Sequence, residues 1–235
     1  MESQKNFFTQ SPWSWKELVL LLTLVLVLVP FFIEYLLANT LTDILQNDLH
    51  SGTLIGFMMS IIFTLGVYVI AVKPKNLKWT EVGFQRFSKS YWISIIGWTL
   101  TLIIISILLA IIIDWLFEIG TNNSKTDSLV TRLSTINIII AFISAAIVSP
   151  IYEEIFYRGF LYRFFRSKCG LLAGMLISSF IFMIVHIPTF NSLPYTFLAG
   201  LVFAWTYEKT QSIYPAMIIH GLFNGIAVVL TALQS

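Results

Sequence analysis

The sequence predicts an all-α fold, a polytopic bundle of about seven transmembrane spans formed by seven or eight helices. The composition is the first reason: 57% of the 235 residues are hydrophobic, only 11% are charged, and the mean hydropathy is +0.83. A soluble domain typically has about 25% charged residues. The second reason is the presence of seven apolar runs long enough to cross a bilayer. The third is that the few ionisable side chains inside these runs are clustered, which predicts a polar site within the bilayer.

The predicted spans follow one another with short polar connections. In chain order they are residues 18–37, 53–72, 92–113, 134–157, 171–187, 194–208 and 213–231. The first run has the ~20 residues that a spanning helix needs, and no clear small-residue cleavage site follows it. We therefore expect a retained first span and no signal peptide.

The distribution of Lys and Arg predicts the orientation, since positively charged loops stay on the cytoplasmic side. Lys5 and Lys16 precede the first span, whereas the loop 38–52 has neither Lys nor Arg. The loop 73–90 has five of them, and residues 158–168 have four more. The alternation predicts a multi-pass cell-membrane protein with a cytoplasmic N-terminus and an external C-terminus.

The polar residues divide the chain into two parts of one integrated membrane domain. Residues 1–130, with about three spans, read as a scaffold, and residues 131–235, with about four spans, contain the polar cluster. The net charge of +2 gives no indication of nucleic-acid binding, and the single cysteine, Cys169, excludes an internal disulfide. Membrane lipid is the one environment that the composition implies.

Two adjacent glutamates interrupt the fourth apolar run. Glu154 and Arg158 are four residues apart, so they share a helix face and can form an ion pair. Glu153 is rotated by ~100° from Glu154 and points away from that pair. One clamped carboxylate and one free carboxylate are typical of a site where the free one acts as a general base.

Three further polar residues lie in later apolar runs. His186 follows Phe182 by four residues, and His220 and Asn224 are also four apart. An imidazole and an amide can both donate hydrogen bonds to a developing oxyanion, while Glu153 with His186 could activate a water. These groups together describe the hydrolysis of an amide without a nucleophilic Ser or Cys.

The expected depths of these groups agree only in part. If the fourth helix runs on to about Ser167, Glu153 lies ~21 Å from that end at 1.5 Å per residue, and His186 lies ~22 Å from Leu171. His220 lies only ~10 Å from the start of its own helix. The sequence leaves open whether tilt, a bend or a shifted helix boundary removes this mismatch.

These motifs resemble those of the CPBP family, the CAAX prenyl proteases and bacteriocin-processing proteins that are also called Abi proteins. The family pattern is EExxxR, FxxxH and HxxxN. It appears here, in order, as Glu153-Glu154 with Arg158, then Phe182 with His186, then His220 with Asn224. The resemblance covers about residues 134–231, and the three motifs together are a specific signal.

The resemblance implies an intramembrane glutamic endopeptidase. It gives Glu153 the role of the base that activates water, with His186 sharing the task. It makes His220 and Asn224 the oxyanion site, and it makes Glu154 and Arg158 a supporting pair. The similar prenyl proteases act without an essential metal, so no cofactor is expected. A short bacterial member of the family would process peptide pheromones or bacteriocins, or confer bacteriocin immunity.

Other interpretations stay open at this stage. If the enzyme were zinc-dependent, Glu153, His186 and His220 would be the ligands, although the sequence has no HExxH motif. A non-proteolytic scaffold or immunity protein that binds a sensor kinase or transporter is an alternative of another class. A transporter with Glu153 as proton site is disfavoured because the chain lacks an internal repeat. The sequence identifies neither the peptide or membrane-protein substrate nor an oligomeric state.

Overall fold

The computed structural model describes residues 7–117 and 134–233, which form helices joined by turns and contain no strand. The helical elements of the N-terminal half are, in order, α2 (Trp15–Thr23), η1 (Leu24–Leu37), α3 (Ala38–Leu45), α4 (Asp48–Gly66), η2 (Val67–Val72), η3 (Lys73–Lys75), η4 (Trp79–Val82), η5 (Lys89–Tyr91) and α5 (Trp92–Phe117). Those of the C-terminal half are α7 (Thr135–Ile143), η6 (Ser144–Val148), α8 (Ser149–Glu154), η7 (Ile155–Tyr162), α9 (Arg163–Ile184), η8 (Phe190–Ser192), α10 (Leu193–Thr210) and α11 (Ile213–Leu233). The predicted all-α architecture is confirmed.

Five continuous helical segments of the described residues are long and apolar enough to cross a membrane: Trp15–Leu45, Asp48–Lys75, Lys89–Leu116, Thr135–Ile184 and Ile213–Leu233. The fourth of these contains two of the predicted spans, because the chain reverses direction within it. The predicted span 194–208 corresponds to α10, which is not among the five segments. The protein is therefore a multi-pass membrane protein. The predicted orientation of its termini stays a prediction, and residues 1–6 with Lys5, as well as the charged stretch 118–133, lie outside the described residues.

Gly170 makes the reversal between the two parts of the fourth segment. Its backbone has φ 86° and ψ 179°, a conformation that is essentially restricted to glycine. The helix that begins at Thr135 consequently runs on to Cys169, and not only to residue 157. The stretch 158–168, counted above as a basic loop, is therefore helical, which corrects that boundary.

Arg163 and Arg166 of this stretch are both paired, which explains why it can stay helical and packed. Arg163 binds the Glu81 carboxylate through Nη2 at 2.7 Å and donates to the carbonyl oxygen of Phe7 through Nε at 3.0 Å. Arg166, which is half-buried, binds Glu208 at 2.9 Å. These ion pairs fix the C-terminal end of the helix that carries the two glutamates.

Polar caps begin several of the long helices. Ser14 and Glu17 form a capping box at the start of α2, and Asn47 accepts a hydrogen bond from the backbone N–H of His50 in α4. Ser134 accepts one from the backbone N–H of Asn137 in α7. Each cap satisfies backbone donors that a helix start leaves without partners.

Pro150 interrupts the regular hydrogen bonding of the helix just before the glutamates. Proline has no backbone N–H, so it cannot donate to the carbonyl group four residues earlier. Wide π-helical turns flank this region, η6 before α8 and η7 after it. Such wide turns are frequent at functional sites.

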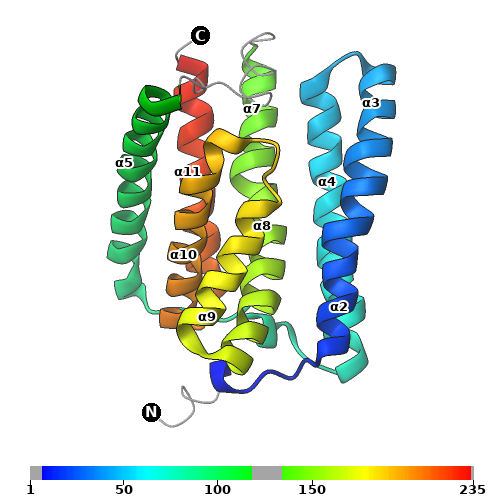
Figure 1. Cartoon of the computed structure of the whole chain (residues 1–235), viewed down its shortest axis with the longest axis vertical. Helices are drawn as coiled ribbons and strands as arrows, with labels where there is room; N and C mark the ends of the chain where they lie inside the picture. Colours follow the sequence, from blue (N-terminus) through cyan, green and yellow to red (C-terminus); the bar gives the residue numbers. More distant parts are fainter. Residues whose placement is uncertain (1–6, 118–133, 234–235) are drawn as a thin grey trace.

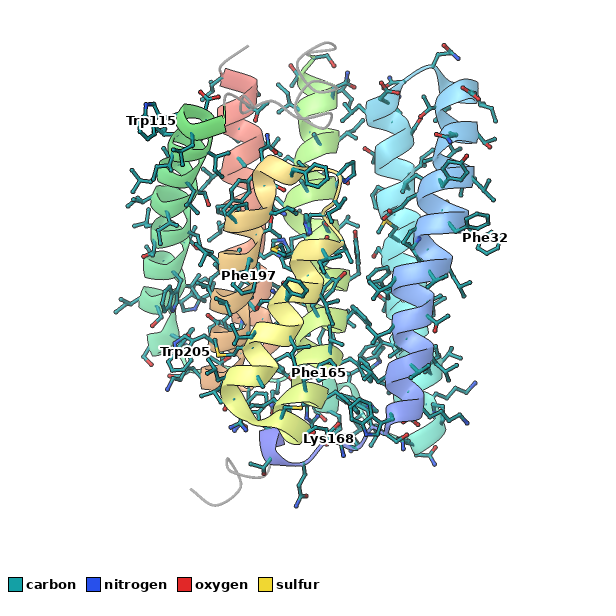
Figure 2. The ribbon with its side chains drawn as sticks, in the orientation of Figure 1. Phe32, Trp115, Phe165, Lys168, Phe197 and Trp205 are labelled. Atoms are coloured by element: carbon teal, nitrogen blue, oxygen red, sulfur yellow. The ribbon has the colours of Figure 1, made fainter. Side chains whose placement is uncertain are left out.

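The helices stand side by side (Figure 1), with α2 to α4 on one side of the bundle, α5 at the opposite edge, and α7 to α11 between them. The two halves are in contact, since α4 packs against α8 and α5 against α11. Large apolar side chains such as Phe32 and Trp115 point outward from the bundle (Figure 2), with exposed fractions of 53% and 79%. An apolar exterior of this kind suits contact with lipid chains.

Candidate active site

The two glutamates lie at the end of α8, in the interior of the bundle. Glu154 is completely buried, Arg158 is 1% exposed, and Glu153 is 9% exposed. Burying an ionised side chain costs free energy unless a partner compensates its charge. The contacts of these three side chains therefore indicate how the site is held together.

Glu154 and Arg158 form the predicted ion pair. Nη1 of Arg158 lies 3.0 Å from Oε1 of Glu154, and its Nη2 donates to the carbonyl oxygen of Gly200 in α10 at 3.3 Å. The guanidinium also lies 4.4 Å from the ring centre of Phe182 and 4.9 Å from that of Phe203. Arg158 thus connects η7 to α9 and α10 through a hydrogen bond and two cation–π contacts.

His220 of α11 lies between the two glutamates. Its Nδ1 is 2.9 Å from Oε1 of Glu154, and its Nε2 is 3.8 Å from Oε2 of Glu153. Because an ionised carboxylate only accepts hydrogen bonds, Nδ1 carries the hydrogen of this contact. The ring is 4% exposed and stacks on Phe203 at 4.7 Å, so its orientation is fixed from two sides.

The two carboxylate oxygens of Glu153 have different surroundings. Oε1 accepts a hydrogen bond from the hydroxyl group of Ser149, one helical turn earlier. Oε2 is buried and has no hydrogen-bond partner among the described residues, and it faces Nε2 of His220. Glu153 makes no ion pair with Arg158, as the helical rotation predicts. Its Oε2 is therefore the oxygen that can accept a proton.

His186 lies at the end of α9 next to the same aromatic cluster. Its Nδ1 is 2.8 Å from the carbonyl oxygen of Phe182, and its ring contacts that of Phe182 at 4.9 Å. The Phe182 ring in turn contacts His220 at 5.8 Å. The ring of Phe182 thus contacts both histidines.

Asn224 faces the same helix as His220 but makes a separate contact. Its amide donates to the carbonyl oxygen of Ala145, in η6, at 3.0 Å. Asn224 lies one turn beyond His220, so both side chains face the helix that carries the glutamates. The predicted oxyanion role of the two residues stays a prediction.

A close approach of backbones permits this arrangement. A Cβ atom on Gly221 would lie only 2.4 Å from the carbonyl oxygen of Ala146, and one on Gly225 would lie 2.8 Å from the Phe142 ring. Any larger residue at position 221 would force α11 away from η6. Gly221 therefore allows His220 to reach Glu154.

The described residues contain no group of three or more His, Cys, Asp or Glu side chains arranged to hold a metal ion. Of the three ligands that zinc would need, Glu153 and His220 lie close together, and His186 contacts Phe182. The Nδ1 atom of His220 is already bonded to Glu154. The expectation of a metal-free site, and the zinc alternative with Glu153, His186 and His220 as ligands, both stay predictions.

The sequence interpretation above omits Ser149, which the structure places against Glu153. A signal was present, because Ser149 precedes Glu153 by four residues and such residues share a helix face. Serines on helices commonly bond to the backbone, which makes this spacing uninformative by itself.

Part of the chain is similar to known membrane peptidases. The family described as type II CAAX prenyl endopeptidase Rce1-like matches residues 135–226, a range that includes all six candidate residues. Over this range, which is less than half of its length, the chain is similar to that family of membrane endopeptidases. Its similarity to the "Putative membrane peptidase YdiL" of Bacillus subtilis is 31% identity over 116 residues, which cover 49% of this chain and 46% of that protein.

Two further relatives match longer parts of the chain. The "Membrane-embedded CAAX protease MroQ" of Staphylococcus aureus is 24% identical over 91% of this chain and 89% of its own length. The "UPF0177 protein YbdI" of Lactococcus lactis is 24% identical over 60% of this chain and 79% of its own. No solved structure gives a significant match.

Proposed function

We propose that the chain is an intramembrane endopeptidase that hydrolyses a peptide bond of a membrane-associated peptide or protein, with Glu153 as the base that activates water. The observation that carries the proposal is the unequal pair of buried carboxylates. Glu154 is held by Arg158 and His220, whereas Oε2 of Glu153 is buried without a hydrogen-bond partner among the described residues. One carboxylate thus holds the site in place and the other is available for chemistry.

The space between Glu153 and His220 suits a reacting water. A separation of 3.8 Å between Oε2 and Nε2 is too long for a hydrogen bond, and polar groups at such a distance are often bridged by water. With the hydrogen of the ring on Nδ1, Nε2 can accept a hydrogen bond from that water. Glu153 accepts its other hydrogen, which would orient the oxygen lone pair toward the substrate.

The reaction then follows the usual course of amide hydrolysis. The water oxygen bonds to the carbonyl carbon, one water proton moves to Oε2 of Glu153, and the carbonyl oxygen becomes an oxyanion. Collapse of the tetrahedral intermediate breaks the C–N bond, and Glu153 returns its proton to the leaving nitrogen. Hydrogen-bond donors aimed at the oxyanion lower the barrier.

The remaining polar residues would surround the carbonyl group. Asn224 can donate to the oxyanion through its amide, Nε2 of His220 faces the same space, and His186 would complete the site from α9. The family resemblance gives His186 the task of sharing the water with Glu153, and Nε2 of His220 lies 3.8 Å from Oε2 of Glu153. No metal takes part in these steps.

The substrate class follows from the location of the site and from the relatives. Groups buried among membrane-spanning helices are reached by an extended peptide segment that enters from the membrane or its surface. Two relatives are named as a membrane peptidase and as a CAAX protease, which supports proteolysis. Within that class we favour peptide pheromones or bacteriocins as substrates. The biological role would be the processing of these peptides or self-immunity to bacteriocins.

The test is cleavage by purified protein in liposomes, read by mass spectrometry on a pool of membrane-associated peptides in water enriched in ¹⁸O. The proposal predicts new C-termini that contain ¹⁸O with the wild type and none with Glu153→Ala. Equal cleavage by both proteins would refute the mechanism. Full cellular function of Glu153→Ala and His186→Ala would instead favour the non-proteolytic scaffold.

A further inference from the structure

Ser149 is a polar residue on the helix of the glutamates that no role described above includes. It is the first residue of α8, half-buried, and lies one turn before Glu153 on the same face. Its hydroxyl group donates a hydrogen bond to Oε1 of Glu153. The hydroxyl group of Tyr152 lies 3.4 Å from the Ser149 Oγ, a much looser contact.

This hydrogen bond makes the two oxygens of Glu153 unequal. Oε1 has a partner, and Oε2, which has none among the described residues, is directed toward Nε2 of His220. The terminal torsion of a glutamate is broad, so a carboxylate without a partner can rotate freely about it. A donor on one oxygen restricts that rotation and keeps the other oxygen in one place.

We infer that Ser149 is a positioning residue, which holds the carboxylate of Glu153 by Oε1 so that Oε2 faces the water and His220. The inference rests on the proposed role of Glu153 as the base. Ser149 does not touch the reacting atoms and acts through Glu153 alone. Proton transfer depends steeply on the placement of the base, so losing this hydrogen bond slows the chemical step and leaves substrate binding nearly unchanged.

A purely structural role for Ser149 predicts different effects of substitution. If the side chain only filled space beside Pro150, its volume would matter and its hydrogen bond would not. Cysteine has nearly the volume of serine but is a weak donor, whereas threonine keeps the hydroxyl group and adds a methyl group. The two variants therefore separate donation from packing.

The experiment measures kcat and KM for peptide cleavage in liposomes with Ser149→Ala, Ser149→Cys and Ser149→Thr. We expect Ser149→Ala to lower kcat about 10-fold or more, as for loss of a hydrogen bond to a charged group, with KM within about 2-fold. Ser149→Thr should recover most of the rate, and Ser149→Cys should resemble Ser149→Ala. Unfolding temperatures in detergent, measured on the same samples, report on folding.

Two controls keep the outcomes distinct. In a Glu153→Gln background, adding Ser149→Ala should cause no further loss, because the group that Ser149 positions is already inactive. Wild-type kcat in Ser149→Ala, or equal recovery by Cys and Thr, would overturn the inference while Glu153 remains the base. If Ser149→Ala fails to fold, the comparison of Cys with Thr decides. Equal cleavage by wild type and Glu153→Gln would refute the proposed function, and this inference with it.

Discussion

The imidazole of His220 forms a hydrogen bond to Glu154 through Nδ1, at 2.9 Å, and the Nε2 atom of the same ring lies 3.8 Å from Oε2 of Glu153. One side chain of α11 thereby contacts the carboxylate that holds the site and faces the one that is available for chemistry. The ring cannot turn without losing its bond to Glu154 and its stacking on Phe203. The hydrogen bond to Glu154 therefore also fixes the position of Nε2 relative to Glu153.

His220→Asn and His220→Ala separate these two functions. An Asn amide can donate to Glu154 from nearly the position of Nδ1, but it has nothing that reaches the water. Both variants should lose cleavage about 100-fold or more, as for loss of an acid–base group. Only His220→Ala should be destabilised by about 1–3 kcal/mol, because Glu154 then loses a buried donor. Thermal unfolding and cleavage rates check this, and near-normal cleavage by His220→Asn would contradict it.

Arg158 compensates a charge in the interior, so its removal should be costly. We expect Arg158→Leu to lower stability by about 3 kcal/mol or more, since Glu154 is then buried without its ion pair. The double variant Arg158→Leu with Glu154→Leu should recover part of the loss. Arg86 is exposed, and Arg86→Leu serves as the control with a change below about 0.5 kcal/mol. Denaturation in detergent measures all four proteins, and equal effects of the two single variants would refute the argument.

Gly221 permits the close packing of α11 on η6. Gly221→Ala should destabilise the protein and reduce cleavage, because the added Cβ would lie 2.4 Å from the backbone oxygen of Ala146. Gly52 in α4 is the matched control, since nothing lies within 4 Å of a Cβ placed there. Gly52→Ala should be neutral or slightly stabilising, by up to about 1 kcal/mol from helix propensity. If the two variants behave alike in unfolding and activity assays, the close approach is not required.

Chelators should leave the reaction unaffected. The described residues hold no group of three metal-ligating side chains, and Nδ1 of His220 is bonded to Glu154. We expect equal rates before and after treatment with a strong chelator and dialysis. Loss of activity that zinc alone restores would show that His186 or His220 binds metal during catalysis.

Interactions within one helix could be predicted from the sequence, and interactions between helices only partly. The pair of Glu154 and Arg158 follows from a spacing of four residues on a regular helix, and the structure confirms it. The contact between His220 and Glu154 does not follow from spacing. Its expected depth of ~10 Å from the helix start disagreed with that of Glu153 because the relative shift of two helices is set by their packing.

The helix boundaries likewise depend partly on contacts between helices, which the sequence does not reveal. The turn at Gly170 depends on one backbone conformation, and the helical course of residues 158–168 depends on partners such as Glu81 and Glu208 far along the chain. Hydropathy alone places the end of the span at the first arginines. The partners that allow Arg163 to be buried become visible only in the folded structure.

The most direct test of the central claim compares single-turnover cleavage by wild type, Glu153→Gln and Glu34→Gln in liposomes. Glu34 is the matched control, an exposed carboxylate within the membrane-spanning segment Trp15–Leu45. If Glu153 is the base, Glu153→Gln should lower the rate by about 100-fold or more while Glu34→Gln stays close to wild type. A Glu153→Gln protein that is folded and cleaves at the wild-type rate would contradict the assignment of Glu153.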